Sequence, residues 1–476
     1  MVNRESLQQL SKDELIDIIL DLSRMADRLT REVIDLKDEA RVLKSPKNSR
    51  NSSFPPSRDL FRSKNTGLRE KSDRKTGGQP GHKGETLQQT KNPDQVVEHY
   101  CDEKCPNCGR VHKADTQSLQ ARRQVIDIPP IQANVVEHRV FQIECPCGHA
   151  SRSQFPAGVT APIQYGNNLT AFVAYLSTRQ YIPFGRIPEL LKSVTNISMS
   201  EGTVFNMLNR TAEYLLPVYA GIKSDIKKAS ALGSDESGAK VGTEKYWAWV
   251  WQTLFETYIT IAPSRGYATI ENEFPKGFPG ATLVSDSLSA QLKTPAFLHQ
   301  LCLAHIIREL NGFIELYDNK WAKQMKGILQ KAIKLKQSMC PEDYTQSYEI
   351  RDRILKEFEA CINLPLQEHI PKLPALQKRL TKNRKSVFTF LFYPEVPFDN
   401  NGSERSIRNI KVKQKVSGSF RSERGAEIFA IIRSVIDTMI KRDVDVFENL
   451  KFILGLAIQK KHSLQVFKSK RNKILK

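Results

Sequence analysis

The switch from helical to strand periodicity at residue 231 constrains the fold of this chain more than any other feature. Three short segments follow it, at 231–241, 244–254 and 257–266, and together they are rich in aromatic and β-branched residues. Their lengths and short separations predict a three-stranded antiparallel meander. A helical stretch near 267–273 comes next, and the apolar run "ATLVSDS" then predicts a fourth strand that ends at Asp286.

Two acidic residues mark this strand pattern. Asp235 lies on the first predicted strand, and Asp286 ends the fourth. A β-β-β-α-β order with acids at these two places is typical of an RNase H-like fold, in which adjacent central strands bring the two acids side by side. We therefore expect a multidomain α/β protein, with a catalytic core at 229–310 and 396–455 that is interrupted by a charged helical insertion at 311–395.

The segment "DNNGSERSIRNIK" places a third acid, Glu404, within a basic run. A helix that begins near residue 400 has Glu404 in its first turn, where the positive helix end keeps the carboxylate ionised. Arg408 and Lys411 then lie one and two turns along the same face and suit a phosphate backbone. Three converging carboxylates can bind two Mg²⁺ or Mn²⁺ ions about 3.5–4 Å apart, an arrangement used for phosphoryl transfer. A plainer alternative is an exposed salt bridge between Glu404 and Arg408.

The net charge points to a polyanionic partner. The 476 residues include 72 Lys and Arg against 52 Asp and Glu, a formal net charge of +20. Cations that neutralise phosphates release condensed counterions, so a polyanion such as double-stranded DNA is the expected partner, although a membrane surface could also attract this charge. The sequence has no apolar run of about 18 residues and no N-terminal signal pattern, which predicts a cytoplasmic, nucleoid-associated protein without a membrane partner.

The N-terminal segment has a strict seven-residue repeat. A capping box at Ser11 and Glu14 opens it. The repeated apolar positions are Leu15, Leu22, Leu29, Leu36 and Leu43, with Ile19, Ala26, Val33 and Ala40 between them. This seam predicts a coiled coil over residues 1–44 and a homo-oligomer that forms through it, although one amphipathic helix packed on the core is the alternative.

Two basic segments have few large apolar residues. Residues 45–95 are rich in Pro, Gly, Ser and basic side chains, so they predict a flexible linker or an arm that orders on DNA. The basic C-terminal segment 456–476 is either a solvated end or a further contact with the DNA backbone.

Half of the cysteines lie in two short turns, CPNCG and CPCG. Cys105, Cys108, Cys145 and Cys147 supply four thiolates for a tetrahedral structural Zn²⁺, which suits a reducing compartment. The residues between the turns alternate like strands, so we expect a zinc-binding β module at 96–160. The second turn is tighter than usual, and Cys101 or His149 is a possible substitute ligand.

Residues 161–228 read as three helices joined by short turns. This arrangement suits a helix-turn-helix DNA-binding region with 200–210 as its recognition helix, and it is equally typical of a small helical bundle.

The chain resembles DDE transposases of the insertion-sequence 66 family. The matching stretches run in order along most of the sequence: "NSRNSSFPPSRD", "GGQPGHKG", the paired cysteine turns, "YGNNLTAFVAYLSTRQYIPFGR", "SMSEGTVFNML", "SDESGAKV", "YWAWVW", "PSRG", "VSDS", "CLAHIIREL" and "DNNGSERSIR". The resemblance implies that Asp235, Asp286 and Glu404 are the catalytic, metal-binding triad. It favours Asp235 over Glu236, and strand alternation agrees because neighbouring strand residues face opposite sides.

The family's Cys-x-x-His-x-x-Arg element is present as Cys302, His305 and Arg308. These residues are expected to shape the site or position DNA, with a buried, hydrogen-bonded core histidine as the alternative for His305. The candidate DNA contacts are Arg265, Arg308, Arg405, Arg408 and Lys411. Departures from the family pattern are the tight CPCG turn and Ser287, where the family tends to have glycine.

The expected function is metal-dependent cleavage at the ends of a mobile element, which frees a 3′-hydroxyl, followed by attack of that hydroxyl on target DNA. The DNA partners are then the terminal inverted repeats and the target, and the resemblance suggests accessory transposition proteins. Two alternatives stay open: a nuclease or resolvase of the same fold without strand transfer, and a DNA-binding regulator derived from a transposase.

Overall fold

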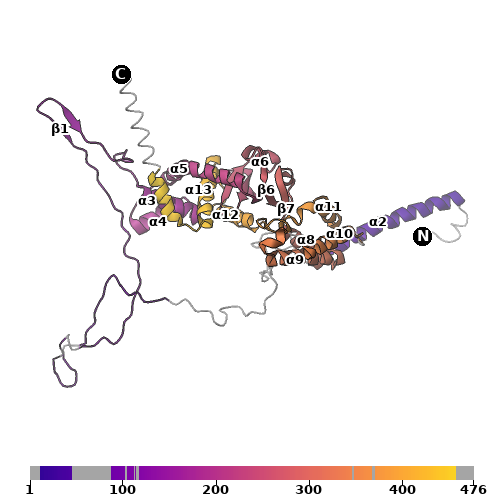
Figure 1. The fold of residues 1–476 in the computed structure, drawn as a ribbon, viewed down its shortest axis with the longest axis horizontal. Coiled ribbons are helices and arrows are strands. Elements are labelled where there is room, and N and C mark those ends of the chain that lie inside the picture. The colour runs from indigo at the N-terminus through magenta and orange to yellow at the C-terminus, as the bar shows by residue number, and fades with distance from the viewer. Residues whose placement is uncertain are drawn as a thin grey trace.

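The computed structural model describes residues 11–44, 87–101, 104–111, 113, 117–345, 348–366 and 370–456. Figure 1 shows a body of helices around a sheet, with helix α2 (Lys12–Lys44) and the chain before α3 (Asn167–Ala174) extending away from it. The predicted tail and nearly all of the predicted basic arm lie outside the described residues.

The centre of the body is one five-stranded mixed sheet. Its strands, in chain order, are β3 (Ala231–Val241), β4 (Glu244–Gln252), β5 (Thr257–Ala262), β6 (Phe278–Ser285) and β7 (Ala296–Leu301). The spatial order is β5-β4-β3-β6-β7, with β3, β4 and β5 antiparallel and β6 parallel to both β3 and β7. The predicted meander and fourth strand are therefore confirmed, as is the helix between them, α6 (Tyr267–Glu273). The sequence analysis did not predict β7.

Alternation along β4 gives the sheet two different faces. The fully buried Trp249 and Trp251 stack on the same side with ring centroids 5.8 Å apart, in the cluster with the N-terminal helices. Val250, between them, belongs to a second cluster with α12 (Asn401–Ser417) and part of α13 (Glu423–Lys441). Both faces of the central strands are thus covered, which is why these strands read as apolar almost throughout.

The three helices predicted for residues 161–228 are present. They are α3, which continues through the π-helical turn η3 (Tyr175–Arg179), α4 (Arg186–Thr195) and α5 (Glu201–Lys228). Ser200 caps α5 by accepting a 3.2 Å hydrogen bond from the backbone N–H of Thr203. The proposed recognition segment 200–210 is only the first part of this 28-residue helix, and its residues Val204, Met207 and Leu208 are buried in the core.

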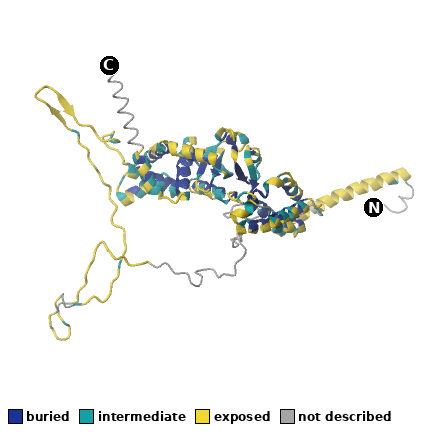
Figure 2. Cartoon of the chain, in the orientation of Figure 1, coloured by how far each residue is buried: buried dark blue, intermediate teal, exposed yellow. Residues whose placement is uncertain are grey.

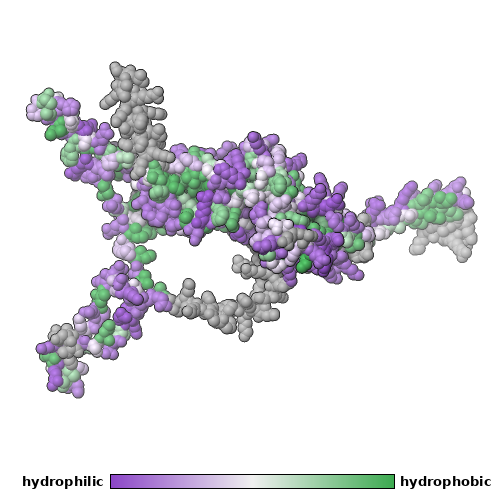
Figure 3. All heavy atoms as spheres, in the orientation of Figure 1, coloured by the Kyte–Doolittle hydropathy of each residue, from purple (hydrophilic) through white to green (hydrophobic). Residues whose placement is uncertain are grey.

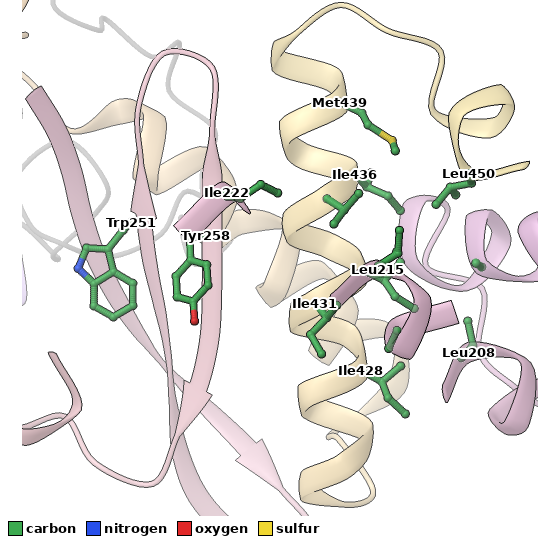
Figure 4. Close-up of a cluster of buried hydrophobic side chains, with 14 of the residues drawn as sticks. Leu208, Leu215, Ile222, Trp251, Tyr258, Ile428, Ile431, Ile436, Met439 and Leu450 are labelled. Atoms are coloured by element: carbon green, nitrogen blue, oxygen red, sulfur yellow. The ribbon is translucent and has the colours of Figure 1, made fainter. Parts of the chain in front are cut away.

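Helix α13 joins these helices to the sheet. Figure 4 shows Ile428, Ile431 and Ile436 on α13 facing side chains of α5, with Trp251 and Tyr258 on the neighbouring strands. Ser434 and Thr438 of α13 accept backbone hydrogen bonds of 2.9 and 3.1 Å from edge strand β5. These contacts satisfy donors that an edge strand otherwise exposes.

The predicted helical insertion has its own core. It comprises α8 (Leu303–Tyr317), α9 (Lys320–Ser338), η4 (Pro341–Tyr344), α10 (Glu349–Ile362), α11 (Leu373–Lys382), η5 (Arg384–Ser386) and η6 (Thr389–Leu391). Trp321, Phe358 and Phe390 are among its buried side chains. The predicted boundary at residue 311 falls inside α8, so the insertion is continuous with the helix that follows β7.

The heptad segment forms α2, and its predicted capping box is confirmed. The backbone N–H of Glu14 donates to Ser11 Oγ at 3.3 Å, and the backbone N–H of Ser11 donates to Glu14 Oε2 at 2.8 Å. The seam residues Ile19, Leu22 and Leu36 are exposed, as Figures 2 and 3 show for this helix. The alternative of a helix packed on the core therefore finds no support among the side chains described on α2.

The β structure predicted for the stretch between the cysteine turns is largely wrong, although an isolated bridge between Lys104 and Val111 flanks the first turn. Among the described residues between them, the strand that forms is β1 (Gln142–Glu144), paired with β2 (Ala150–Arg152) after the second turn. The alternating residues before β1, such as Ile126 and Ile128, are exposed and lack strand structure. Alternation produces a strand only where another strand supplies hydrogen bonds, and Pro129 and Pro130 remove two donors from this stretch.

Candidate active site

The parallel pairing of β3 with β6 sets the positions of the first two acids. Gly233 pairs with Val284 in the register of these strands. Asp235 and Asp286 each lie two residues beyond that pair, so the two carboxylates reach the same level at the carboxyl end of adjacent strands. The predicted side-by-side placement is therefore confirmed.

The environment of Asp235 disfavours its charge. Burial raises the pKa of Asp235 well above its usual value, and the nearby charges of Asp286 and Glu236 raise that pKa further. Its Oδ1 accepts a 2.8 Å hydrogen bond from the backbone N–H of Glu236, which only partly offsets these effects. Neighbouring carboxylates repel one another, and a cation bound between them relieves that repulsion.

Asp286 lies beside the Cys-x-x-His element at the start of α8. Its Oδ1 is 3.0 Å from His305 Nδ1. This oxygen is buried, and the His305 ring is its close contact within the described part of the chain. Cys302 Sγ lies 3.4 Å from the same His305 Nδ1 and accepts a 3.2 Å hydrogen bond from the backbone N–H of Asn400.

Burial and the neighbouring Asp286 carboxylate shift the pKa of His305 in opposite directions. Burial alone lowers the pKa of His305, but the hydrogen-bonding contact and charge of Asp286 outweigh it, and the net shift is upward. The His305 ring is largely buried, and both of its nitrogens contact polar groups of the candidate site.

Arg308 connects this histidine to the third acid. Its Nη1 lies 3.1 Å from His305 Nε2, and its Nη2 donates a 2.8 Å hydrogen bond to Glu404 Oε1. Glu404 Oε2 is also 3.3 Å from Arg408 Nη2, so the predicted alternative salt bridge is present as well. A continuous polar path therefore runs from Asp286 through His305 and Arg308 to Glu404.

Helix α12 reaches the sheet through residues for which the sequence analysis predicted no role. Asn400 Nδ2 donates a 2.7 Å hydrogen bond to the backbone oxygen of Ser234, and Ser403 Oγ donates one of 2.7 Å to Asn400 Oδ1. A Cβ on Gly233 would lie 2.7 Å from Ser403 Oγ, so only glycine permits this approach. The signal in the sequence was the polar run "DNNGS", whose buried partners are not visible before folding.

Glu236 is held away from the Asp235–Asp286 pair. Arg265 Nη2 and Gln291 Nε2 donate to its carboxylate at 2.7 and 3.1 Å. Burial raises the pKa of Glu236 although Arg265 opposes the shift. The preference for Asp235 over Glu236 as the first metal-binding acid agrees with this arrangement. Gln291, which bonds Glu236, is a further residue of the site that the sequence analysis missed.

The five predicted DNA-contacting cations differ in whether they already contact the protein. Arg265 bonds Glu236 and stacks 4.8 Å from the Trp247 ring, and Lys411 donates a 2.6 Å hydrogen bond to the Gly238 oxygen. Arg308 and Arg408 both bond Glu404. Arg405 and Arg408 are exposed on α12.

The three carboxylates do not meet as tightly as expected. Among the described residues, the possible ligand atoms that lie within 4.8 Å of one another belong to Asp286, Cys302 and His305. Asp235 and Glu404 lie outside this group, and Glu404 instead contacts Arg308 at 2.8 Å and Arg408 at 3.3 Å. The Asp286 carboxylate and the adjacent Asp235 carboxylate nevertheless fit a divalent cation that prefers oxygen ligands.

The four predicted zinc ligands form two similar turns. The backbone N–H of Gly109 donates to the Cys105 oxygen at 2.9 Å, and that of Gly148 donates to the Cys145 oxygen at 2.8 Å. Both glycines have positive φ, 66° and 85°, which closes each turn tightly. Each turn thus pairs two cysteines, but the described residues do not bring all four thiols into one cluster, so that expectation is not met in this structure.

The thiols themselves suit zinc chemistry. Hydrogen bonds from Cys108 and Asn107 lower the pKa of Cys105, and a hydrogen bond with Cys145 lowers that of Cys147. Thiolates are the form that binds metal, so this donor set fits Zn²⁺.

Three models of protein families match parts of this chain. The model of a family described as "Transposase IS66 family" matches residues 162–428, and that of the "zinc-finger binding domain of transposase IS66" matches residues 102–148. A family of unknown function matches residues 6–88. No match was found among curated proteins.

The class of protein is therefore a transposase with an N-terminal zinc-finger domain. The first family model covers more than half of the chain, and the chain belongs to the IS66 family of transposases. Within the described residues, no helix is both long enough and apolar enough to span a membrane.

Proposed function

We propose that this transposase has an RNase H-like domain that uses Asp235, Asp286 and Glu404 to cut element ends and join them to target DNA. The observation that carries the proposal is the common level of Asp235 and Asp286 on parallel strands β3 and β6. Helix α12 begins against Ser234 of the same strand, and Glu404 lies 3.8 Å from the His305 ring that contacts Asp286, which supports its inclusion. The strand order β5-β4-β3-β6-β7, antiparallel on one side and parallel on the other, supports the RNase H-like assignment.

Each residue of the proposed site has a distinct role. Asp235 and Asp286 offer oxygen ligands, and Glu404 supplies a third carboxylate whose position Arg308 fixes. Divalent ions bound there, Mg²⁺ or Mn²⁺, would supply Lewis acidity for phosphodiester hydrolysis and transesterification. Arg405 and Arg408 hold the DNA backbone beside these acids.

The remaining parts of the chain bring the DNA ends to this site. The exposed apolar seam of α2 pairs two or more protomers, since a helix with this repeat gains stability by burying Leu22, Leu29 and Leu36 against a copy of itself. The two cysteine turns form one structural zinc site when they close on the metal, and this module, with the helices of residues 161–228, binds the terminal repeats.

The test is transposition in cells, with the gene supplied apart from a marker flanked by the element's own ends. Asp235→Asn, Asp286→Asn and Glu404→Gln remove a negative charge at each position with little change in shape. We expect each variant to abolish movement of the marker while purified protein still binds the terminal DNA. Glu423→Gln is the matched control, because Glu423 is also in the first turn of a helix but bonds Tyr246 through its carboxylate.

Two results would contradict the proposal. Wild-type movement by the three variants would show that these acids are not catalytic. Cleaved DNA without joined products, in reactions that contain the neighbouring accessory proteins, would identify a nuclease instead.

A further inference from the structure

We propose that the helical insertion carries a binding site for one unpaired DNA nucleotide, in a cavity formed where α10 meets η5. The cavity has a volume of about 490 Å³ and is lined by Leu355, Glu359, Arg384, Lys385, Phe388 and Phe392. This volume lies within the range of small-ligand sites and suits a nucleotide, whereas a duplex is far too wide to enter. The proposal rests on DNA as the substrate of the proposed function.

The apolar part of the cavity suits a nucleobase. Phe388 is 3% exposed and packs edge-on against Phe358 at 4.9 Å, so its position is fixed. Phe392 is 41% exposed, an unusual state for so large an apolar side chain at the edge of a well-packed core. The Arg351 guanidinium lies 4.6 Å from the centre of its ring, which orients the ring. An exposed, oriented aromatic ring is a stacking platform for an unpaired base.

The polar rim suits the phosphate of the same nucleotide. The fourteen residues from 372 to 385 contain six Lys and Arg and no Asp or Glu. Lys378, Lys382, Arg384 and Lys385 in this stretch are exposed. Glu359 is the one acidic residue in the lining, and it lies 3.9 Å from Arg384. The Glu359 carboxylate can accept a hydrogen bond from an amino or imino group of a base, whereas it would repel a second phosphate.

The cavity is joined rigidly to the candidate active site. Thr389 Oγ1 donates a 2.7 Å hydrogen bond to the His299 oxygen, and Gln300 Nε2 donates one of 2.9 Å to the Val387 oxygen. His299 and Gln300 belong to β7, the strand that leads into Cys302 and α8. A nucleotide bound in this cavity therefore has a defined position relative to the candidate active site. Such a position suits a base that becomes unpaired when the DNA strands separate near the cleavage point.

The test uses the full-length protein and two oligomers of equal length and charge. One is a short oligothymidylate, and the other is the same deoxyribose-phosphate chain without bases. We expect the protein to prefer the oligothymidylate. Phe392→Ala should weaken oligothymidylate binding by roughly 5- to 100-fold and leave binding of the abasic oligomer unchanged, because stacking on one aromatic ring contributes about 1–3 kcal/mol per base.

Charge-matched double variants separate the site from general attraction. Arg384→Glu with Lys385→Glu should weaken binding of both oligomers, whereas Lys320→Glu with Lys326→Glu on α9 makes the same change of charge away from the cavity and should keep the preference for bases. Equal losses in the two double variants would overturn the proposal, as would wild-type binding by Phe392→Ala. Photocrosslinking of wild type with an iodouracil-containing oligomer provides a check independent of folding: crosslinks within α10, η5 and η6 support the site, and crosslinks confined elsewhere overturn it.

This outcome is separable from that of the proposed function. Asp235→Asn should lose transposition and keep the base preference, so a failure of the catalytic assignment leaves the nucleotide site intact. Equal displacement of the oligothymidylate by polyglutamate and by unlabelled oligothymidylate would instead identify an acidic protein segment as the occupant and would overturn the nucleotide assignment.

Discussion

Arg308 on α8 donates a 2.8 Å hydrogen bond to Glu404 on α12, although the two residues are 96 positions apart in the chain. The same guanidinium contacts His305, which lies 3.0 Å from Asp286. One arginine thus links the two ends of the candidate site. The position of the proposed third carboxylate, Glu404, therefore depends on α8, which continues into the helical insertion, as much as on its own helix α12.

Arg308→Met should lower strand-transfer activity by roughly 10- to 100-fold, as the loss of a hydrogen-bond partner of a metal-binding residue commonly does. The measurement is product formation against Mg²⁺ concentration, where a weakened hold on Glu404 should raise the concentration needed for half-maximal activity. Arg379→Met is the control. Arg379 on α11 donates a 2.7 Å hydrogen bond to Glu309, which lies on α8 like Arg308 but is not one of the three proposed catalytic acids. Equal Mg²⁺ dependence in the two variants would contradict this role.

Gly233→Ala should destabilise the contact between β3 and α12. The added Cβ would lie 2.7 Å from Ser403 Oγ and closer still to Asn400 Oδ1, so α12 must shift at a cost of about 1–3 kcal/mol. Chemical denaturation measures the loss in free energy of unfolding. Gly238→Ala on the same strand has open space around the new Cβ and should change stability little. A similar loss in both variants would show that strand glycine itself, rather than the close approach, is responsible.

Ser287→Gly should stabilise the fold by about 0.5–1 kcal/mol. Ser287 follows Asp286 with φ of 72°, a left-handed conformation that costs a non-glycine residue about 1–2 kcal/mol. Part of this gain is lost to the greater freedom of glycine in the unfolded chain. The departure from the family's glycine at this position therefore carries strain. Thermal unfolding compares this variant with Ser289→Gly in α7 (Ser289–Leu292), which should lower stability instead.

Lys413→Met should stabilise the protein at neutral pH, and the gain should disappear in alkali. Burial lowers the pKa of Lys413 from 10.5 to about 8. The unfolded chain therefore binds more protons between pH 8 and pH 10.5, and the wild-type free energy of unfolding rises through that window. Below pH 8 the buried charge costs wild type about 3 kcal/mol, which the variant avoids.

Denaturation at several pH values tests the lysine assignment. The stability difference between wild type and Lys413→Met should shrink as the pH rises from 8 to 10.5. Lys415→Met on the same helix is the control, because Lys415 is exposed and should show a small, pH-independent difference. A constant difference for Lys413→Met would refute a lowered pKa.

Removal of the zinc thiols should release metal. Purified wild-type protein is expected to contain structural zinc, and Cys105→Ser or Cys145→Ser should each lose most of it, since one missing thiolate opens the tetrahedral site. Elemental analysis measures the content. Cys340→Ser, which changes an exposed cysteine just before η4, should keep the metal. Undiminished zinc in either turn variant would indicate that Cys101 or His149 replaces the missing ligand.

Sequence periodicity was sufficient to predict the helices and strands whose hydrogen-bonding partners are close together in the chain. Periodicity predicted the helices α3 to α5, the β3–β4–β5 meander and the start of α12, because backbone hydrogen bonds in these elements join residues a few positions apart or across short turns. It failed for β7, whose six residues resemble any short apolar run until β6 pairs with them. It also failed between the cysteine turns, where alternation found no partner strand.

The sequence by itself determined the chemistry available to this protein: one acid on the first core strand and another at the end of the fourth, a third in a first helical turn, paired thiols and a large positive charge. Tertiary structure alone decided how those groups meet. The register of β3 against β6 aligns Asp235 with Asp286, and Arg308 draws Glu404 toward His305. These relationships depend on side chains that are far apart along the chain and become neighbours only when the sheet and helices pack together, so no local pattern encodes them.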